Sequence, residues 1–408
     1  MKFNKSGHLI VAAALSLMAA SLLTACTTLT VDFVFVTSSK AAGANNYGLI
    51  DVFEINSESG KMRPIPSSPF PSGGRLPVAE TVSADNQNLF VVNEDDNNIV
   101  QFTIGSDGKL YPYSTVNTPG IFPLAVAATK SNLFVADLYQ PLPLCSNADP
   151  CSGSIAVYPI NAASGSNPIT LGIPLTNTTV DAQYWPLTLP ESTHIVVPTA
   201  VNVVASGSYL FVTAYDSTVK PFAGYIFGFS VGSDGTLTAV PGSPFAYGRQ
   251  LSGIASDATS TYLYVTDYGL GNVLAFNIGG SGSLTPVAGS PFAAGNQPSA
   301  VVVDSAYPYA YVTNALDGTV SAYSISGGAL TNLGTYTVGS DPVAIGIDPS
   351  TEHFLFVADF LDSTVYGFEL STSAGTLLNS QFSPFNASTN PTAVAAIPHN
   401  GTGGGIAK

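Results

Sequence analysis

A short apolar segment recurs seven times along the chain, and each copy is followed by polar turn residues. The copies share a Phe-Val or Tyr-Val core. They begin at Val34, Leu89, Leu133, Leu210, Leu263, Ala310 and Leu355. A unit that returns about every fifty residues is typical of a repeat architecture, in which each repeat is one supersecondary unit.

Each copy lies within a longer pattern of four short apolar or alternating segments. In one repeat an apolar stretch at Ser299–Ser305 precedes Tyr311-Val-Thr-Asn314. An alternating stretch follows at Thr319–Ile325, and a fourth begins after Gly328-Ala-Leu330. Four short strands separated by Gly, Asn, Asp and Ser turns are typical of a propeller blade. The sequence therefore predicts an all-β fold built from four-stranded antiparallel blades.

The two ends of the pattern predict how the array closes. The first Phe-Val-Thr segment, near Val34, has no apolar segment before it, and the last apolar segment, Thr392–Pro398, has no Phe-Val segment after it. Pairing these two segments completes a seventh blade and removes two exposed sheet edges. A linear array would need capping repeats. We therefore expect a closed seven-bladed β-propeller over residues 33–398.

One repeat, the third, departs from the others because residues 139–200 form an insertion. Within it, Ser154–Ile160 still reads as the third strand of the blade. The insertion also contains Cys145, Cys151, Trp185, Glu191 and His194. Two cysteines this close together in an exported chain predict a local disulfide. Long insertions are often functional, so the segment is either an aromatic flap over the channel or surface decoration.

The N-terminal residues predict export and lipid attachment. Lys2 and Lys5 precede an apolar stretch at Leu9–Leu23, and Leu23-Thr-Ala-Cys26 matches a bacterial lipobox. Residues 1–25 would be a signal peptide, Cys26 the lipidated residue, 26–32 a tether, and 399–408 a flexible tail. Because Thr27 rather than Asp follows the cysteine, the outer membrane is favoured. An ordinary secretory signal with an incidental cysteine is the alternative.

Composition limits the partners. The chain has 11 Lys and Arg against 26 Asp and Glu, a formal charge of −15. Such an acidic balance argues against nucleic acid and anionic membrane surfaces, and less strongly against phosphorylated substrates. Apart from the lipid anchor, a protein or carbohydrate partner stays open, and we expect a monomer.

Polar residues at the strand ends are the candidate ligand-binding residues, because these loops converge on the central channel. The set comprises Asn93, Glu94, Asp95, Asp96, Asp137, Asp267, Tyr268, Asn314, Asp341 and Asp359. Short polar side chains also cap turns by bonding their own backbone, which is the alternative for each of them. The acidic run Glu94-Asp95-Asp96 could offer oxygen ligands to Ca²⁺, although it lacks the spacing of an EF-hand loop. No other cofactor is indicated.

Tyr311-Val-Thr-Asn314, together with Pro342–Pro349, resembles the YVTN-type propeller repeats of bacteria. The strand pattern of residues 33–398 resembles the seven-bladed lactonase family, which includes 6-phosphogluconolactonase-like proteins. That family carries a Pro-His-x-His strand and then an Asp-Leu-Gly-x-Asp loop. The counterparts here are Arg249-Gln-Leu-Ser-Gly253 and Asp267-Tyr-Gly-Leu-Gly271, and both histidines are missing.

Two functions therefore stay open. The first is an envelope-anchored binding module for a protein or glycan. The second, implied by the resemblance, is a hydrolase acting on a lactone or sugar-derived substrate, with Asp267, Arg249 and Arg75 as candidate catalytic residues.

Overall fold

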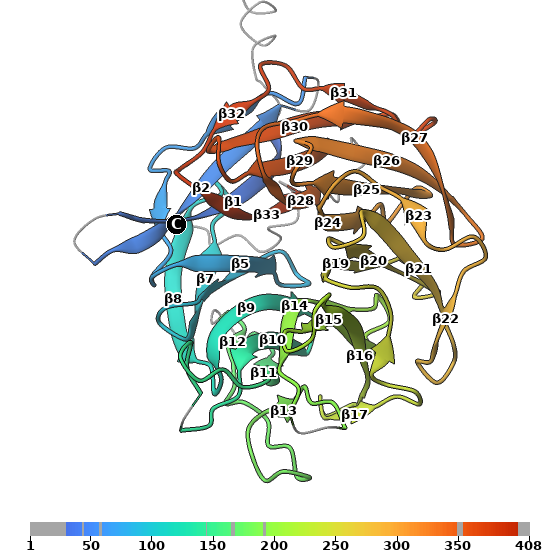
Figure 1. Ribbon diagram of the computed structural model, residues 1–408. Helices are drawn as coiled ribbons and strands as arrows, with labels where there is room; N and C mark the ends of the chain where they lie inside the picture. Colours follow the sequence, from blue (N-terminus) through green and yellow to red (C-terminus); the bar gives the residue numbers. More distant parts are fainter. Residues whose placement is uncertain are drawn as a thin grey trace, which may run out of the picture. The chain divides into compact units, whose positions relative to one another are not determined.

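All regular structure in the described part of the chain is β-strand (Figure 1). The computed structural model describes residues 30–42, 45–56, 59–143, 145–164, 168–190, 193–348 and 354–398. The predicted signal peptide, Cys26 and the tail 399–408 lie outside these residues. Within the described residues, no helix has the length and apolar character needed to cross a membrane.

The strands form seven antiparallel sheets, numbered here as blades 1 to 7, each given from its innermost strand outward. Blade 1 consists of β33 (Pro391–Pro398), β1 (Thr30–Ala42), β2 (Tyr47–Asn56), β3 (Met62–Pro64) and β4 (Phe70–Pro71). Blade 2 consists of β5 (Pro77–Val82), β6 (Asn88–Asn93), β7 (Asn98–Ile104) and β8 (Leu110–Asn117). Blade 3 consists of β9 (Ile121–Ala128), β10 (Asn132–Tyr139), β11 (Ser154–Asn161), β12 (Thr170–Leu171) and β13 (Trp185–Pro186).

The remaining four blades repeat this plan. Blade 4 consists of β14 (Val196–Val203), β15 (Tyr209–Asp216), β16 (Ala223–Val231), β17 (Leu237–Ala239) and β18 (Phe245–Ala246). Blade 5 consists of β19 (Leu251–Ser256), β20 (Tyr262–Asp267), β21 (Asn272–Ile278), β22 (Leu284–Pro286) and β23 (Phe292–Ala293). Blade 6 consists of β24 (Pro298–Val303), β25 (Tyr309–Asn314), β26 (Thr319–Ser326) and β27 (Ala329–Thr337). Blade 7 consists of β28 (Pro342–Ile347), β29 (Phe354–Asp359), β30 (Thr364–Leu370), β31 (Leu377–Asn379) and β32 (Phe385–Asn386).

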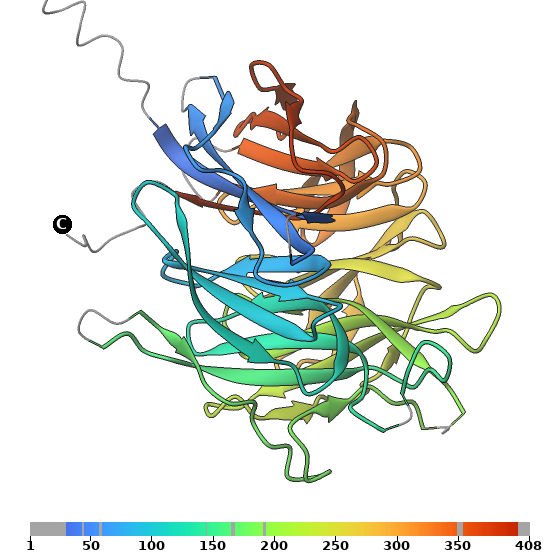
Figure 2. The same ribbon diagram turned by 90° about the vertical axis from the view of Figure 1, so that its left-hand side faces the viewer.

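The innermost strands form a closed circle around the axis, because each contacts the innermost strand of the next blade and β33 contacts both β28 and β5. In blade 1, β33 pairs antiparallel with β1, with Phe33 opposite Ile397 and Val36 opposite Val394 (Figure 2, the red and blue strands). The Thr392 hydroxyl donates to the carbonyl of Thr37 at 3.1 Å and to that of Pro77 in blade 2 at 3.0 Å. The predicted seven-bladed ring, closed by the terminal strands, is confirmed.

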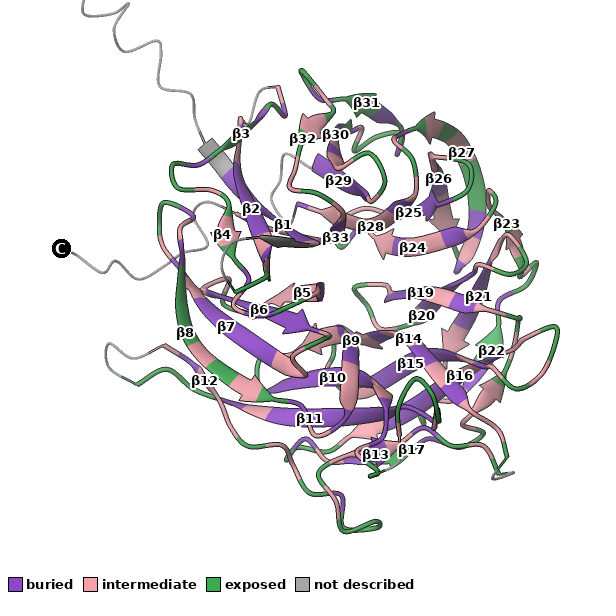
Figure 3. Ribbon diagram, turned by 60° about the vertical axis from the view of Figure 1, so that its left-hand side comes forward, coloured by how far each residue is buried: buried purple, intermediate pink, exposed green. Residues whose placement is uncertain are grey.

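The Phe-Val segments are apolar on both faces because each lies between two neighbouring blades. All six residues of β6 are buried, as are all six of β25 and of β29 (Figure 3). Burial on both faces explains why these strands read as continuous apolar runs rather than as alternating ones. The cores between blades hold the loops at the ends of the strands in fixed positions.

The insertion in blade 3 contributes to the blade itself. Residues 139–200 include β11, β12, β13 and the first part of β14. Trp185 is only 6% exposed, and its indole N–H donates to the Leu237 carbonyl of blade 4 at 2.9 Å. The flap hypothesis is therefore wrong for Trp185, which packs between blades. The predicted Cys145–Cys151 disulfide is present, and Glu191 lies outside the described residues.

Candidate functional site

The innermost strands all start at the same end of the ring, and one residue stands before the Pro or Leu at each start. These seven residues, called the mouth ring here, are Leu76, Phe122, Val197, Gln250, Gln297, Asp341 and Asn390. Every member is half-buried. Five of them, Leu76, Phe122, Gln297, Asp341 and Asn390, have φ between +51° and +59°. The shared position next to the first Pro or Leu of each inner strand places the seven residues at one end of the channel, and five of them also share a left-handed backbone conformation.

The mouth ring is polar on one side and apolar on the other. Blades 5, 6, 7 and 1 contribute Gln250, Gln297, Asp341 and Asn390, called the polar arc. Blades 2, 3 and 4 contribute Leu76, Phe122 and Val197, called the apolar arc. None of the seven members, all within the described residues, is Lys, Arg or His. A ligand at this ring would therefore meet amides, one carboxyl group and apolar surface.

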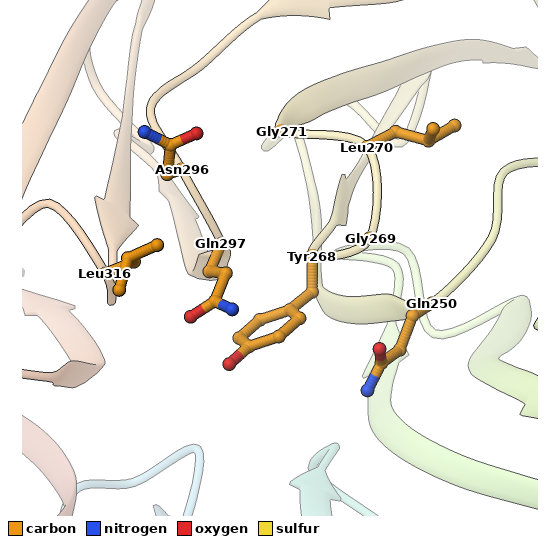
Figure 4. Close-up of a pocket in the computed structure, with 8 residues that line it drawn as sticks. All are labelled: Gln250, Tyr268, Gly269, Leu270, Gly271, Asn296, Gln297 and Leu316. Carbon is orange, nitrogen blue, oxygen red and sulfur yellow. The ribbon is translucent and has the colours of Figure 1, made fainter.

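A pocket of about 380 Å³ opens beside the polar arc, between the loops of blades 5 and 6 (Figure 4). It is lined by Gln250, Tyr268, Gly269, Leu270, Gly271, Asn296, Gln297 and Leu316. In Figure 4 the side chains of Gln250, Gln297 and Tyr268 extend to the same side of the pocket, and those of Leu270 and Leu316 lie apart from them. Leu270 and Leu316 are 46% and 67% exposed and form an apolar rim.

Tyr268 lines this pocket, and Asp341 of the polar arc interacts electrostatically with its hydroxyl group. Burial raises the pKa of the Tyr268 hydroxyl, and the charge of Asp341 raises it further. Burial also raises the pKa of Asp341. The Tyr268 N–H donates to the Gln250 carbonyl at 2.9 Å, which fixes the tyrosine against the mouth ring. A phenol and a carboxyl group therefore face the same end of the channel.

Asp267, predicted as a catalytic residue, instead organises the backbone. Its carboxylate is fully buried. It accepts the N–H groups of Arg249 (2.8 Å), Gln250 (3.2 Å), Gly269 (3.0 Å) and Leu270 (3.1 Å). Four backbone donors saturate a carboxylate, so Asp267 ties the two pocket loops together and is not placed to act on a ligand. The Arg249 side chain is exposed outside the mouth ring.

Five blades share one feature of this arrangement: a glycine packs on the polar residue at or near the end of the second strand. The pairs are Gly74–Asn93, Gly120–Asp137, Gly248–Asp267, Gly295–Asn314 and Gly339–Asp359. A Cβ at each glycine would come within 2.3 to 2.8 Å of its partner, which leaves no room for another residue. All five polar partners are fully buried. None of the five lines the pocket. The capping alternative holds for Asp267 and for Asn314, which accepts the Gly295 N–H at 2.9 Å, whereas Asn93 bonds through Nδ2 to the Asn98 side chain.

Arg75 and the acidic run of blade 2 are also engaged with each other. Asp96 accepts the Arg75 backbone N–H at 2.8 Å and its Nε at 2.7 Å, and Arg75 Nη2 donates to the Asp95 carbonyl at 3.2 Å. Burial, and then the charge of Asp95, raise the pKa of Glu94. The part of the chain that the structure describes contains no group of three His, Cys, Asp or Glu side chains able to hold a metal. The calcium hypothesis therefore has no structural support.

One pair of polar side chains had no signal in the sequence. His194, on the loop before β14, pairs through Nδ1 with Asp216 at the end of β15. Asp216 also accepts the Thr218 hydroxyl at 2.5 Å. Burial acts to raise the pKa of Asp216, but the bonds from Thr218 and the pairing with His194 outweigh it and lower the pKa. The pair lies 22 residues apart in the chain, within no known motif spacing.

Buried carboxyl groups predict that the propeller loses stability as pH rises. Burial raises the pKa of Asp137 and Asp359 to about 8 and that of Glu80 to about 7. The folded chain therefore holds protons that the unfolded chain releases near pH 4, and stability falls between about pH 4 and pH 8. Asp137→Asn removes one such carboxyl group. The substitution should fit the site, because Asn93 in blade 2 and Asn314 in blade 6 hold the position that Asp137 holds in blade 3. We expect its thermal midpoint to exceed that of the wild type at pH 8 and to match it near pH 4.

Differential scanning calorimetry at both pH values tests this expectation, with the exposed Asp234→Asn as the control. Each pKa unit corresponds to about 1.4 kcal/mol, so the gain of Asp137→Asn at pH 8 should be a few kcal/mol. Equal midpoints for Asp137→Asn and wild type at pH 8 would show that Asp137 is not destabilising.

The described strands form a seven-bladed β-propeller. Residues 281–399 match the family model described as "Lactonase, 7-bladed beta-propeller". The resemblance to this family that the strand pattern predicts is confirmed.

Solved structures show the same fold over most of the chain. The periplasmic gluconolactonase of Pseudomonas aeruginosa is 18% identical, with a TM-score of 0.68 over 90% of this chain and 99% of that one. A Bacteroides fragilis protein described as a candidate 6-phosphogluconolactonase is 19% identical, with a TM-score of 0.67 over 91% of this chain and 99% of that one. No curated protein matches the chain. At these identities the likeness establishes the fold alone.

Proposed function

We propose that the propeller binds a small uncharged cyclic ligand, a sugar or a sugar-derived lactone, in the pocket beside the polar arc. The observation that carries this proposal is the composition of the pocket, whose polar side chains are Gln250, Asn296, Gln297 and Tyr268. Side-chain amides both donate and accept, so they match the hydroxyl and carbonyl groups of such a ring. An aromatic ring adds an apolar face against which the ligand can lie.

The charge pattern favours an uncharged ligand over a phosphorylated one. Phosphate recognition relies on Arg, Lys or backbone N–H clusters, and the mouth ring has no cationic member. Arg75 is paired with Asp96. Asp341 adds negative charge to the same end of the channel and would repel a phosphate.

Replacement of Tyr268 by alanine should weaken ligand binding because it removes the aromatic wall of the pocket. We expect the dissociation constant for methyl β-D-glucoside, measured by isothermal titration calorimetry, to rise roughly tenfold, about 1.4 kcal/mol. Tyr113→Ala is the matched control, because Tyr113 is 43% exposed on β8, far from the mouth ring along its blade. A wild-type protein that binds no neutral sugar or lactone contradicts the proposal.

Lactone hydrolysis is the second candidate, and Asp341 is the observation that favours it. A half-buried carboxyl group with a raised pKa, close to the Tyr268 hydroxyl, is suited to activate water beside a bound lactone carbonyl. The named neighbours described as lactonases support the same reaction class. The test measures turnover of a panel of uncharged lactones. Turnover by the wild type that Asp341→Asn loses while it still binds the lactone would establish an enzyme. Binding without turnover by the wild type would leave a binding protein as the proposed function.

Export and anchoring are proposed from the sequence alone. The lipobox at Leu23–Cys26 supports a lipid-anchored protein of the cell envelope, with the outer membrane favoured. Incorporation of labelled palmitate that disappears in Cys26→Ala would support it, and an unlabelled wild-type protein would contradict it.

A further inference from the structure

The apolar arc has no role in binding a sugar ring, yet it faces the same end of the channel as the polar arc. Leu76, Phe122 and Val197 take the positions that Gln250, Gln297, Asp341 and Asn390 occupy in the other four blades. All three are half-buried, so part of each side chain reaches solvent. A ligand held by the polar arc therefore has apolar surface across the axis from it.

Aromatic side chains support the apolar arc from behind. The Phe122 ring meets Tyr139 edge to face, with ring centroids 6.0 Å apart. Val197 lies opposite Tyr215 in the β14–β15 pair, and the Tyr215 ring packs against Phe222 with centroids 4.8 Å apart. The Tyr139 hydroxyl donates to Asn147 Oδ1 within the disulfide loop at 3.1 Å. Aromatic rings therefore back Phe122 and Val197 in blades 3 and 4, and Leu76 continues the arc in blade 2.

The backbone of two members makes their apolar character costly. Leu76 and Phe122 have φ of +51° and +56°, in the left-handed region. Asn and Asp tolerate this region because their short polar side chains bond locally, whereas large apolar residues disfavour it. Asp341 and Asn390 hold the same conformation in blades 7 and 1. Leucine and phenylalanine are therefore retained at positions for which the backbone alone favours asparagine, as is typical of functional sites.

We propose that the ligand is amphiphilic: an uncharged polar ring bound by the polar arc, carrying an alkyl, acyl or aryl substituent that lies on Leu76 and Phe122. The inference rests on the proposed function, because the pocket must first hold the polar ring. Burial of the substituent against the apolar arc adds hydrophobic stabilisation in proportion to the apolar area removed from water. A ligand without the substituent leaves that wall in contact with water.

Two neutral probes with one head group test the inference: methyl β-D-glucoside and hexyl β-D-glucoside, titrated calorimetrically below the micellar concentration. The experiment uses the full-length protein with its Cys145–Cys151 disulfide intact. We expect the hexyl glycoside to bind roughly tenfold more tightly, well under the full transfer free energy of its added methylenes.

The double variant Leu76→Asn with Phe122→Asn copies the residue type found at Asn390 and removes two of the three members of the apolar arc, leaving Val197. It should reduce the hexyl preference to within about twofold and leave the affinity for methyl glucoside unchanged. Asparagine suits a left-handed backbone such as that of Asn390, which offsets part of the loss of the Phe122–Tyr139 contact, so the double variant should still fold. Each single variant should remove part of the preference, which keeps the test valid if the double variant folds poorly.

Leu378→Asn is the control, because Leu378 is 67% exposed on β31 at the outer part of blade 7. It should retain the full preference. Equal binding of both glycosides by the wild type, or a preference that survives the double variant, overturns the inference and leaves the proposed function intact. Failure to bind either glycoside contradicts the proposed function and the inference with it.

Discussion

Deletion of residues 391–398 is expected to abolish the cooperative fold of the propeller. These residues form β33, whose loss exposes the edge of β1 and opens the ring between blades 7 and 2. Phe33, Val34, Phe35 and Val36 are buried, with Ile397 on the opposite strand. An exposed, apolar and unpaired strand edge is also a template for aggregation. Far-ultraviolet circular dichroism and thermal unfolding of the purified chain measure the effect.

Deletion of residues 399–408, which follow β33, is the control and should leave the thermal midpoint unchanged. A synthetic peptide of sequence 391–398 added in trans should partly restore the shortened chain if strand pairing is the cause. A shortened chain that unfolds at the wild-type midpoint would mean that the ring does not depend on its terminal pair.

Replacement of Asp267 by alanine should destabilise the protein by about 3 kcal/mol or more. The substitution leaves four backbone N–H groups without their shared acceptor, and each unsatisfied buried donor costs about 1 to 3 kcal/mol. Water can reach part of this loop, which limits the total. Urea unfolding gives the free energy, and the same preparation can be titrated with methyl glucoside to measure the loss of pocket geometry.

Asp267→Asn and Asp234→Ala are the two controls for the Asp267→Ala measurement. Asparagine keeps one acceptor oxygen and should cost less than alanine. Asp234 is exposed and bonds only to its own turn through Thr236, so its loss should leave the free energy of unfolding almost unchanged. If Asp267→Ala keeps wild-type stability and loses only turnover, Asp267 is a catalytic residue after all and the structural role assigned to it is wrong.

The fold could be predicted from the sequence because its signal is local and repeated. Each blade contains the same apolar strand, and the two unmatched terminal segments leave one way to complete the circle. The disulfide could be predicted equally well, because Cys145 and Cys151 are only six positions apart in the chain. How much of the blade 3 insertion forms strands was harder to predict, because β12 and β13 contain two residues each and leave no periodic pattern in the sequence.

The candidate site could be predicted only in part. A polar residue after a buried strand reads the same whether it faces a ligand or its own backbone, so Asp267 and Asp137 could not be separated from Tyr268. The residues before each inner-strand proline carry the better signal, and Asp341 was found there. The His194–Asp216 pair could not be anticipated, because an irregular loop brings the two residues together.

The pairing of a glycine with a buried Asp or Asn has a consequence for how this protein can change. In five blades it fixes both ends of the loop and leaves two residues between the glycine and the first Pro or Leu of the inner strand: Arg75-Leu76, Ile121-Phe122, Arg249-Gln250, Asn296-Gln297 and Ser340-Asp341. Each dipeptide can therefore be substituted while the glycine and its buried polar partner stay the same. New ligand specificities can arise by substitution of these two residues in each blade, without a change in the strands that position them.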